Sequence, residues 1–165
     1  MRSADYWIEK LALTPHPEGG YYREVYRATE SVLKEALPER FEGPRSFSTS
    51  IFFILKSGQV SRLHRLKSDE IWHFYEGCPL IIHRIHPDGG YSEIKLGRDA
   101  DAGQVFQAVV PAGTWFGATV SAAEGYALVG CTVGPGFDFA DFELGRRDAL
   151  LSRFPRLADQ IKKLT

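Results

Sequence analysis

The sequence has few cysteines: only Cys78 and Cys131 occur among its 165 residues. Neither belongs to a Cys-x-x-Cys pair or to a Cys/His cluster, so the spacing excludes the cysteine-based zinc motifs and a disulfide-rich secreted scaffold. Nothing near either residue in the sequence would lower the pKa of its thiol. We expect two reduced cysteines buried in strands.

Long apolar runs and an excess of one charge are also missing. The apolar run Ile51–Leu55 is far shorter than the roughly 20 residues that cross a bilayer as a helix. The first ten residues carry charges where a signal peptide has an apolar run. With 20 basic and 21 acidic side chains, no basic stripe indicates binding to nucleic acid or to an anionic membrane. These absences predict a cytoplasmic protein with neither kind of partner.

What remains is typical of one globular domain spanning residues 1–165. Hydrophobic residues make up 44% and charged residues 25%, and no repeat or linker divides the chain. Short β-rich segments separated by Gly, Pro and Asp turns predict an all-β sandwich or barrel. These segments are 21–28, 46–55, 60–66, 70–77, 80–86, 91–96, 104–110, 114–120 and 126–133. Helical patterns are confined to 4–13 and to 146–164, where Pro155 divides them, and 28–44 is expected to be a loop or weak hairpin.

The most informative polar residues flank Lys67. If the strands on either side of it form a hairpin, His64 lies opposite Glu70 and Arg62 lies opposite Trp72. A carboxylate beside an imidazole raises the histidine pKa and fixes its tautomer, so His64 is a candidate general base oriented by Glu70. Such a pair is also a common structural feature, and both interpretations stay open.

The same stretch resembles the first motif of cupins. Its pattern is G-x5-H-x-L-x3-E-x6-G, from Gly58 to Gly77, and the second motif is resembled by "VVPAGTWF", with Pro111 and Gly113. Most of residues 14–144 is similar to a cupin subfamily that is catalogued as a domain of unknown function. The resemblance implies an all-β jelly-roll barrel with a pocket in its mouth, here with a short N-terminal helix and C-terminal helical segments, usually as a homodimer.

The chain departs from the cupin pattern at the metal. A cupin metal normally takes three histidines and one glutamate, and by this resemblance His64 and Glu70 match two of the four positions. Leu66 and Phe116 stand at the other two. Two ligands cannot complete a zinc or iron site, so we expect no tightly bound metal and no other cofactor. Three other histidines remain as alternatives: His73, His83 and His86.

We therefore predict a pocket centred on His64 and Glu70 with an apolar floor. Leu66 and Phe116 suit a ligand with a hydrophobic or aromatic part. An inward Arg62 would bind an anion or stack on an aromatic ring. The remaining predicted lining residues are Phe74 and Thr132. His16, in a proline-rich turn, is expected to be solvated or bonded to backbone.

Three functions are compatible with this pocket. The first is a small-molecule-binding protein, with an unknown metabolite as partner. The second is a metal-independent isomerase or epimerase in which His64 is the base, because "SRLHRL" and "EGGYYREVYR" are similar to segments of nucleotide-sugar 3,5-epimerases. The third is a structural dimeric barrel without a ligand. The apolar content of "SIFFIL" and "IWHFY" and the cupin habit of pairing predict a homodimer.

Overall fold

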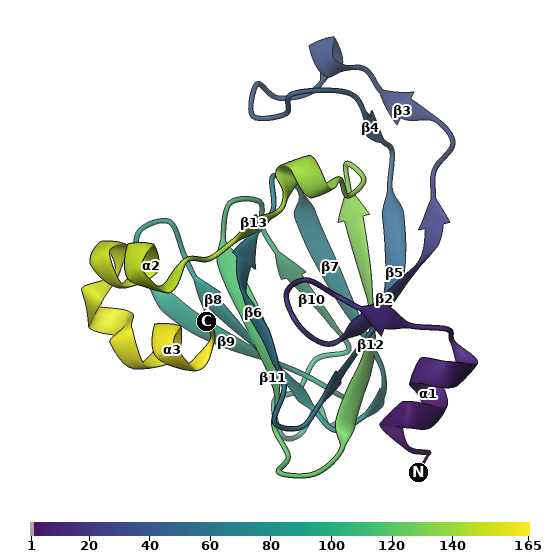
Figure 1. Ribbon diagram of the computed structural model, residues 1–165, viewed down its shortest axis with the longest axis vertical. Helices are drawn as coiled ribbons and strands as arrows, with labels where there is room; N and C mark the ends of the chain where they lie inside the picture. The colour runs from purple at the N-terminus through teal and green to yellow at the C-terminus, as the bar shows by residue number, and fades with distance from the viewer. Residues whose placement is uncertain (1) are drawn as a thin grey trace.

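The computed structural model describes residues 2–165, and its body consists of two facing antiparallel β-sheets (Figure 1). The six-stranded sheet contains, in spatial order, β1 (Thr14–Pro15), β2 (Tyr21–Arg27), β5 (Thr49–Lys56), β12 (Tyr126–Gly134), β7 (Asp69–Gly77) and β10 (Gln107–Val110). The five-stranded sheet contains β13 (Glu143–Leu144), β6 (Val60–Arg65), β11 (Trp115–Val120), β8 (Leu80–Ile85) and β9 (Tyr91–Leu96). This arrangement confirms the predicted jelly roll.

The core lies between the sheets and follows from the two-residue period of the strands. Phe53, Leu55, Trp72 and Val129 point inward from the six-stranded sheet and are almost fully buried. Each such side chain stabilises the fold by about 1.5–3 kcal/mol relative to an exposed one. The alternating apolar pattern therefore identifies the faces that form the barrel interior.

Short helices cover the outside of the barrel at two places. Helix α1 (Ala4–Lys10) begins at Ser3, whose side chain accepts a hydrogen bond from the Tyr6 amide, and packs on the outer face of the six-stranded sheet. Helices α2 (Arg147–Arg153) and α3 (Ala158–Lys163), separated by the 3-10 turn η3 (Pro155–Leu157), pack beside the five-stranded sheet. None of the described helices is long and apolar enough to cross a membrane.

An arm projects from the barrel between β2 and β5 (Figure 1). It contains the two-stranded sheet of β3 (Ser31–Val32) and β4 (Arg45–Ser46) and the 3-10 turn η1 (Lys34–Ala36). Of the two alternatives predicted for 28–44, a loop or a weak hairpin, the structure shows the hairpin, whose second strand begins just after this range. At its base the Arg45 guanidinium donates two hydrogen bonds of 2.6 Å to the Asp141 carboxylate, and both side chains are buried. This ion pair ties the arm to the 3-10 turn η2 (Phe139–Asp141).

The predicted hairpin around Lys67 is wrong. Strand β6 pairs with β11 and β13, whereas β7 pairs with β12 and β10, so the chain crosses from one sheet to the other at Lys67. His64 is paired with Phe116, and Glu70 is paired with Val110 and Val133. Because the two-residue period predicts which face a side chain takes but not which strand lies beside it, the sequence could not distinguish these topologies.

Candidate functional site

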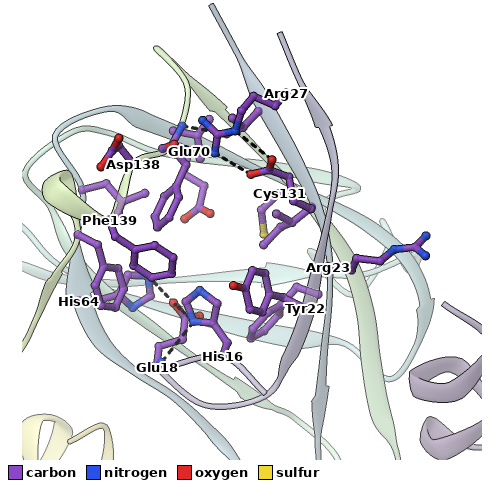
Figure 2. A pocket seen from close by; sticks show the side chains of 18 of the residues that line it. His16, Glu18, Tyr22, Arg23, Arg27, His64, Glu70, Cys131, Asp138 and Phe139 are labelled. Carbon is purple, nitrogen blue, oxygen red and sulfur yellow. Dashed lines mark hydrogen bonds and ion pairs between the residues drawn. The ribbon is translucent and has the colours of Figure 1, made fainter. Parts of the chain in front are cut away.

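A cavity of about 540 Å³ lies between the two sheets and opens at the end of the barrel near β2 (Figure 2). Four of its titratable side chains come from both sheets and from the turn before β2: His16, Glu18, His64 and Glu70. Most of the remaining wall is apolar and aromatic, and its rings belong to Tyr22, Phe53, Trp72, Phe137, Phe139 and Phe142. The volume is in the range typical of small-molecule sites.

His64, on β6, is held rigidly at the inner wall. Its ring is 2% exposed, and the Phe116 ring packs against it with centroids 4.1 Å apart. Its Nδ1 lies 2.7 Å from the carbonyl oxygen of Arg62, and its Nε2 lies 3.1 Å from Oε2 of Glu18. Since a carbonyl oxygen only accepts, Nδ1 carries a proton. Burial is the main cause that lowers the pKa of His64.

Glu18, rather than Glu70, is the carboxyl group that contacts His64. It lies in the tight turn before β2, where Gly19 has a φ of 114° and its backbone approaches Val60 so closely that a side chain would clash. The Ser61 hydroxyl donates a 2.7 Å hydrogen bond to Glu18 Oε1. Burial raises the pKa of Glu18, partly offset by His16, Ser61 and Arg62.

Glu70 faces the cavity from β7 and is 7% exposed. Burial raises its pKa to about 7, and the His64 ring opposes this rise. The Trp72 indole and the Cys131 thiol also lower the pKa of Glu70, but the indole N–H and Glu70 Oε2 both lack a partner with hydrogen-bond geometry. Glu70 is therefore a buried carboxyl group that is largely unsatisfied by the protein itself.

Charged groups are concentrated at the mouth of the cavity. Arg27 donates to both carboxylate oxygens of Glu24, at 2.9 and 2.7 Å, and to the Phe137 carbonyl oxygen at 3.1 Å. The Arg23 guanidinium points away from the cavity (Figure 2). A ligand would therefore pass charged side chains at the mouth before it enters the cavity. Inside, burial favours the neutral forms of the acidic and basic side chains.

Two of the predicted apolar lining residues lie at the inner end. Leu66 lines the cavity, and Phe116 lies against the His64 ring as part of the core. Phe74 instead packs into the core beside the cavity and lies under the Arg98 guanidinium. Thr132 takes the outer face of the sheet, where its hydroxyl lies 3.1 Å from His73 Nε2.

The prediction that Arg62 points into the pocket is wrong. Arg62 is exposed, and its Nη2 donates to the Pro17 carbonyl oxygen at 2.6 Å. Strand β6 holds one extra residue opposite β11, because Phe116 pairs with His64 and Ala118 pairs with Ser61. This β-bulge breaks the two-residue period, so Ser61 shares the inward face with His64 and Arg62 does not.

Among the polar or thiol groups of the cavity that the sequence interpretation missed are His16, Glu18 and Cys131. His16 was expected to be solvated or bonded to backbone, and the second alternative holds, because its Nδ1 accepts the Glu18 backbone N–H at 3.3 Å. Its side chain is only 7% exposed and lies against Tyr22, with ring centroids 4.5 Å apart. The segment "PHPEGGYYREVYR", which contains the first two, lies within residues 14–144, most of which resembles the cupin subfamily. The sequence signal for this part of the site was the presence of polar residues in a Gly-rich turn. The partner of Glu18 on β6, Ser61, is more than 40 residues away along the chain.

The donor set does not fit a cupin metal. Leu66 and Phe116 offer no ligand atoms, and His64 directs Nε2 at Glu18. Within residues 2–165 no three His, Cys, Asp or Glu side chains converge as a metal-binding group. The three alternative histidines make other contacts: His73 with Thr132 and Gln107, His83 with Tyr91 and Thr119, and His86 with Ser92.

Comparison with known proteins agrees with this architecture. An uncharacterized protein of Saccharomyces cerevisiae is 29% identical over 143 residues, which cover 81% of this chain and 71% of the yeast protein. A crystal structure of a Shewanella oneidensis protein matches with a TM-score of 0.89 and 41% identity, covering 100% of this chain and 98% of the other. A hypothetical protein from Leishmania major matches with a TM-score of 0.90 and 36% identity, covering 99% of both chains.

More distant matches share the fold alone. An oxalate decarboxylase mutant from Bacillus subtilis has a TM-score of 0.56 at 17% identity, and the match covers 93% of this chain but 37% of that enzyme. The sequence model described as "Cupin superfamily (DUF985)" matches residues 5–145. With the jelly roll and the cavity at its mouth, this match establishes that the chain belongs to the DUF985 family of the cupin superfamily.

Proposed function

We propose that this protein binds a small organic metabolite in the cavity between its sheets. The observation that carries the proposal is Glu70, a buried carboxyl group whose Oε2 has no hydrogen-bond partner among the described residues. Leaving such a group unpaired costs about 1–3 kcal/mol. A ligand with a complementary polar atom would remove this cost, and the cavity of about 540 Å³ has room for one.

The walls constrain the kind of ligand. Aromatic rings from β2, β5, β7 and the segment after β12 surround the space, and Leu66 closes part of the inner end. Such walls favour a hydrophobic or aromatic part. The polar atoms of the ligand would then meet Glu70 and His16, and burial favours the neutral form of both side chains. We infer a ligand with an apolar body and one oxygen-bearing end.

A screen of metabolites by thermal shift, followed by calorimetric titration of each hit, tests the proposal. Glu70→Ala should weaken binding by at least about tenfold, because it removes the polar contact. Glu76→Ala is the matched control, since Glu76 is on the same strand but contacts the Tyr126 hydroxyl outside the cavity. If no compound raises the melting temperature, or if both variants weaken binding equally, the binding proposal is wrong and the structural barrel is favoured.

A metal-independent isomerase or epimerase is the second candidate. It is supported by the His64 ring, whose Nδ1–H is fixed by the Arg62 carbonyl oxygen and whose Nε2 faces a buried carboxyl group. Turnover assays on the binding hits test it. His64→Ala should abolish turnover, and His83→Ala, which changes an equally buried histidine on β8, should not. Hits that bind without turnover would leave only the binding function.

The proposal includes a homodimer located in the cytoplasm. Tyr75 and Val109, 42% and 48% exposed, leave apolar surface on the outer face of the six-stranded sheet, which a second copy would cover. Cys78 and Cys131 are both free thiols, in keeping with a reducing compartment.

A further inference from the structure

Glu18 contacts two histidines, and neither histidine in its neutral form has a proton on the nitrogen that faces the carboxyl group. Glu18 Oε2 lies 3.1 Å from His64 Nε2 and 3.3 Å from His16 Nδ1. In a neutral His64 the proton is on Nδ1, which donates to the Arg62 carbonyl oxygen, so Nε2 bears a lone pair. In a neutral His16, Nδ1 also bears a lone pair, because it accepts the backbone N–H of Glu18 at 3.3 Å.

An ionised Glu18 beside two neutral rings would thus bring three electron-rich atoms together with no hydrogen between them. The side chains of His16, Glu18 and His64 are only 7%, 7% and 2% exposed, so bulk solvent screens this repulsion weakly. One proton placed between Glu18 Oε2 and a ring nitrogen replaces this repulsion with an attraction. These contacts therefore favour a cluster that holds one proton more than a carboxylate and two neutral histidines together.

Nearby charges affect where this proton resides. Burial raises the pKa of Glu18 and lowers the pKa of both His16 and His64, so it favours the neutral carboxyl group. Arg62, on β6, favours the carboxylate, and Ser61 donates to it from the same strand. Across the cavity, Glu70 on β7 favours a charged His64. Burial is the largest of these causes and favours the proton on Glu18, and the nearby charges oppose it.

His16 is the member that faces the cavity with a free polar atom. Both nitrogens of His64 are engaged, whereas no hydrogen bond among residues 2–165 uses His16 Nε2. The His16 ring lines the cavity and is held between Tyr22 and Phe139, with ring centroids at 4.5 and 6.3 Å (Figure 2). Because Nδ1 accepts a hydrogen bond, Nε2 carries the proton of the neutral ring and is a donor toward the ligand.

We propose that His16, Glu18 and His64 form an acid–base centre that holds one exchangeable proton, and that His16 Nε2 presents it to a carbonyl or carboxylate oxygen of the bound ligand. In a transfer, the Nε2 proton moves to the ligand oxygen, the Glu18 backbone N–H releases His16 Nδ1, and the Glu18 Oε2 proton moves to that nitrogen. His16 is neutral before and after, the ligand gains one proton, and Glu18 is left as a carboxylate that accepts from Ser61. The transfer to a ligand rests on the proposed function; the proton-holding centre does not.

The protonation states can be measured without a ligand. In long-range proton–nitrogen spectra of protein labelled with 15N-histidine at neutral pH, we expect a proton on Nδ1 of His64, a proton on Nε2 of His16, and one further proton shared with Glu18. Glu18→Ala should remove the shared proton. Glu18→Gln should keep the tautomers of both histidine rings, because the amide N–H can replace the carboxyl O–H. This variant also provides the test if Glu18→Ala does not fold.

Glu93→Ala is the matched control, because Glu93 is a carboxyl group 3.3 Å from another buried histidine, His83. It should leave the His16 and His64 signals unchanged. Any one of four results would overturn the proton-holding centre. The spectra could show both His16 and His64 charged, both neutral beside an ionised Glu18, or a neutral His64 with its proton on Nε2. The fourth result is that neither Glu18 variant has an effect.

Benzoate, an aromatic carboxylate, is the probe for the ligand contact. Its addition should shift the Nε2 resonance of His16 and leave His83 unmoved, and His16→Phe should weaken benzoate binding by at least about tenfold. Benzoate that binds without moving His16 overturns the role of His16 and leaves the binding function intact. If neither benzoate nor any metabolite binds, the transfer to a ligand fails together with the proposed function, and the ligand-free spectra still decide whether the proton-holding centre exists.

Discussion

Glu70→Gln should make the stability of this protein less sensitive to alkaline pH. Glutamine has the shape of a protonated glutamic acid but cannot ionise. In the wild-type protein, burial raises the pKa of Glu70 from 4.5 to about 7. At 1.36 kcal/mol per pKa unit, this difference corresponds to about 3 kcal/mol of unfolding free energy. The substitution therefore removes a penalty that exists only when Glu70 is ionised.

The sign follows from proton counts. Between pH 4.5 and about 7 the folded state keeps the Glu70 proton that the unfolded state has lost. Stability therefore falls as pH rises through this window, and the loss is complete above the folded-state pKa. The lowered pKa values of His16 and His64 act in the opposite direction below their usual value of 6.5. The contribution of Glu70 is therefore isolated only by the difference in unfolding free energy between the wild-type protein and Glu70→Gln.

Urea unfolding followed by tryptophan fluorescence at pH 5, 6, 7 and 8 measures that difference. We expect the stability of Glu70→Gln relative to wild type to increase by roughly 2–3 kcal/mol from pH 5 to pH 8. Any constant offset from the amide group does not affect this slope. Glu76→Gln, on the same strand, should show no such increase. A Glu70→Gln difference that does not change with pH would show that Glu70 ionises normally and would refute the reasoning.

Three further predictions concern metal, assembly and the arm. Purified protein should contain less than about 0.2 equivalents of any transition metal, because Leu66 and Phe116 stand where ligands are needed; near-stoichiometric metal that is lost in His64→Ala would contradict this. Light scattering at micromolar concentration should give a dimer, with an interface of at least roughly 1,200 Å² in total, and a monomer would contradict it. Asp141→Ala should lower the unfolding free energy by about 3–5 kcal/mol, because it leaves the buried Arg45 guanidinium unpaired; a loss below about 1 kcal/mol would show that the pair is effectively solvated.

The local pattern of the sequence was sufficient for the strands and for much of the barrel interior. Alternation along β5 and β7 predicted the strands whose inward residues form the core, and Pro155 correctly divided the C-terminal helices. The motif spacing also identified two side chains that line the cavity, His64 and Glu70. These features depend on short-range geometry, namely the two-residue period of a strand and the backbone limits of proline and glycine.

The partners of these residues depend on contacts between distant segments. His64 and Glu70 do not share a hairpin, because the chain crosses between sheets after β6. The carboxyl group that contacts His64 belongs to Glu18, from a turn that precedes β2.

By itself, the sequence determined the β-rich fold class, the apolar floor at Leu66 and the absence of two cupin ligands. Only the tertiary structure decided that His16, Glu18 and His64 meet in one cluster while Arg62 turns outward. The physical reason is that strand pairing, a β-bulge in β6 and the burial that shifts pKa values are set by packing between segments far apart in the chain.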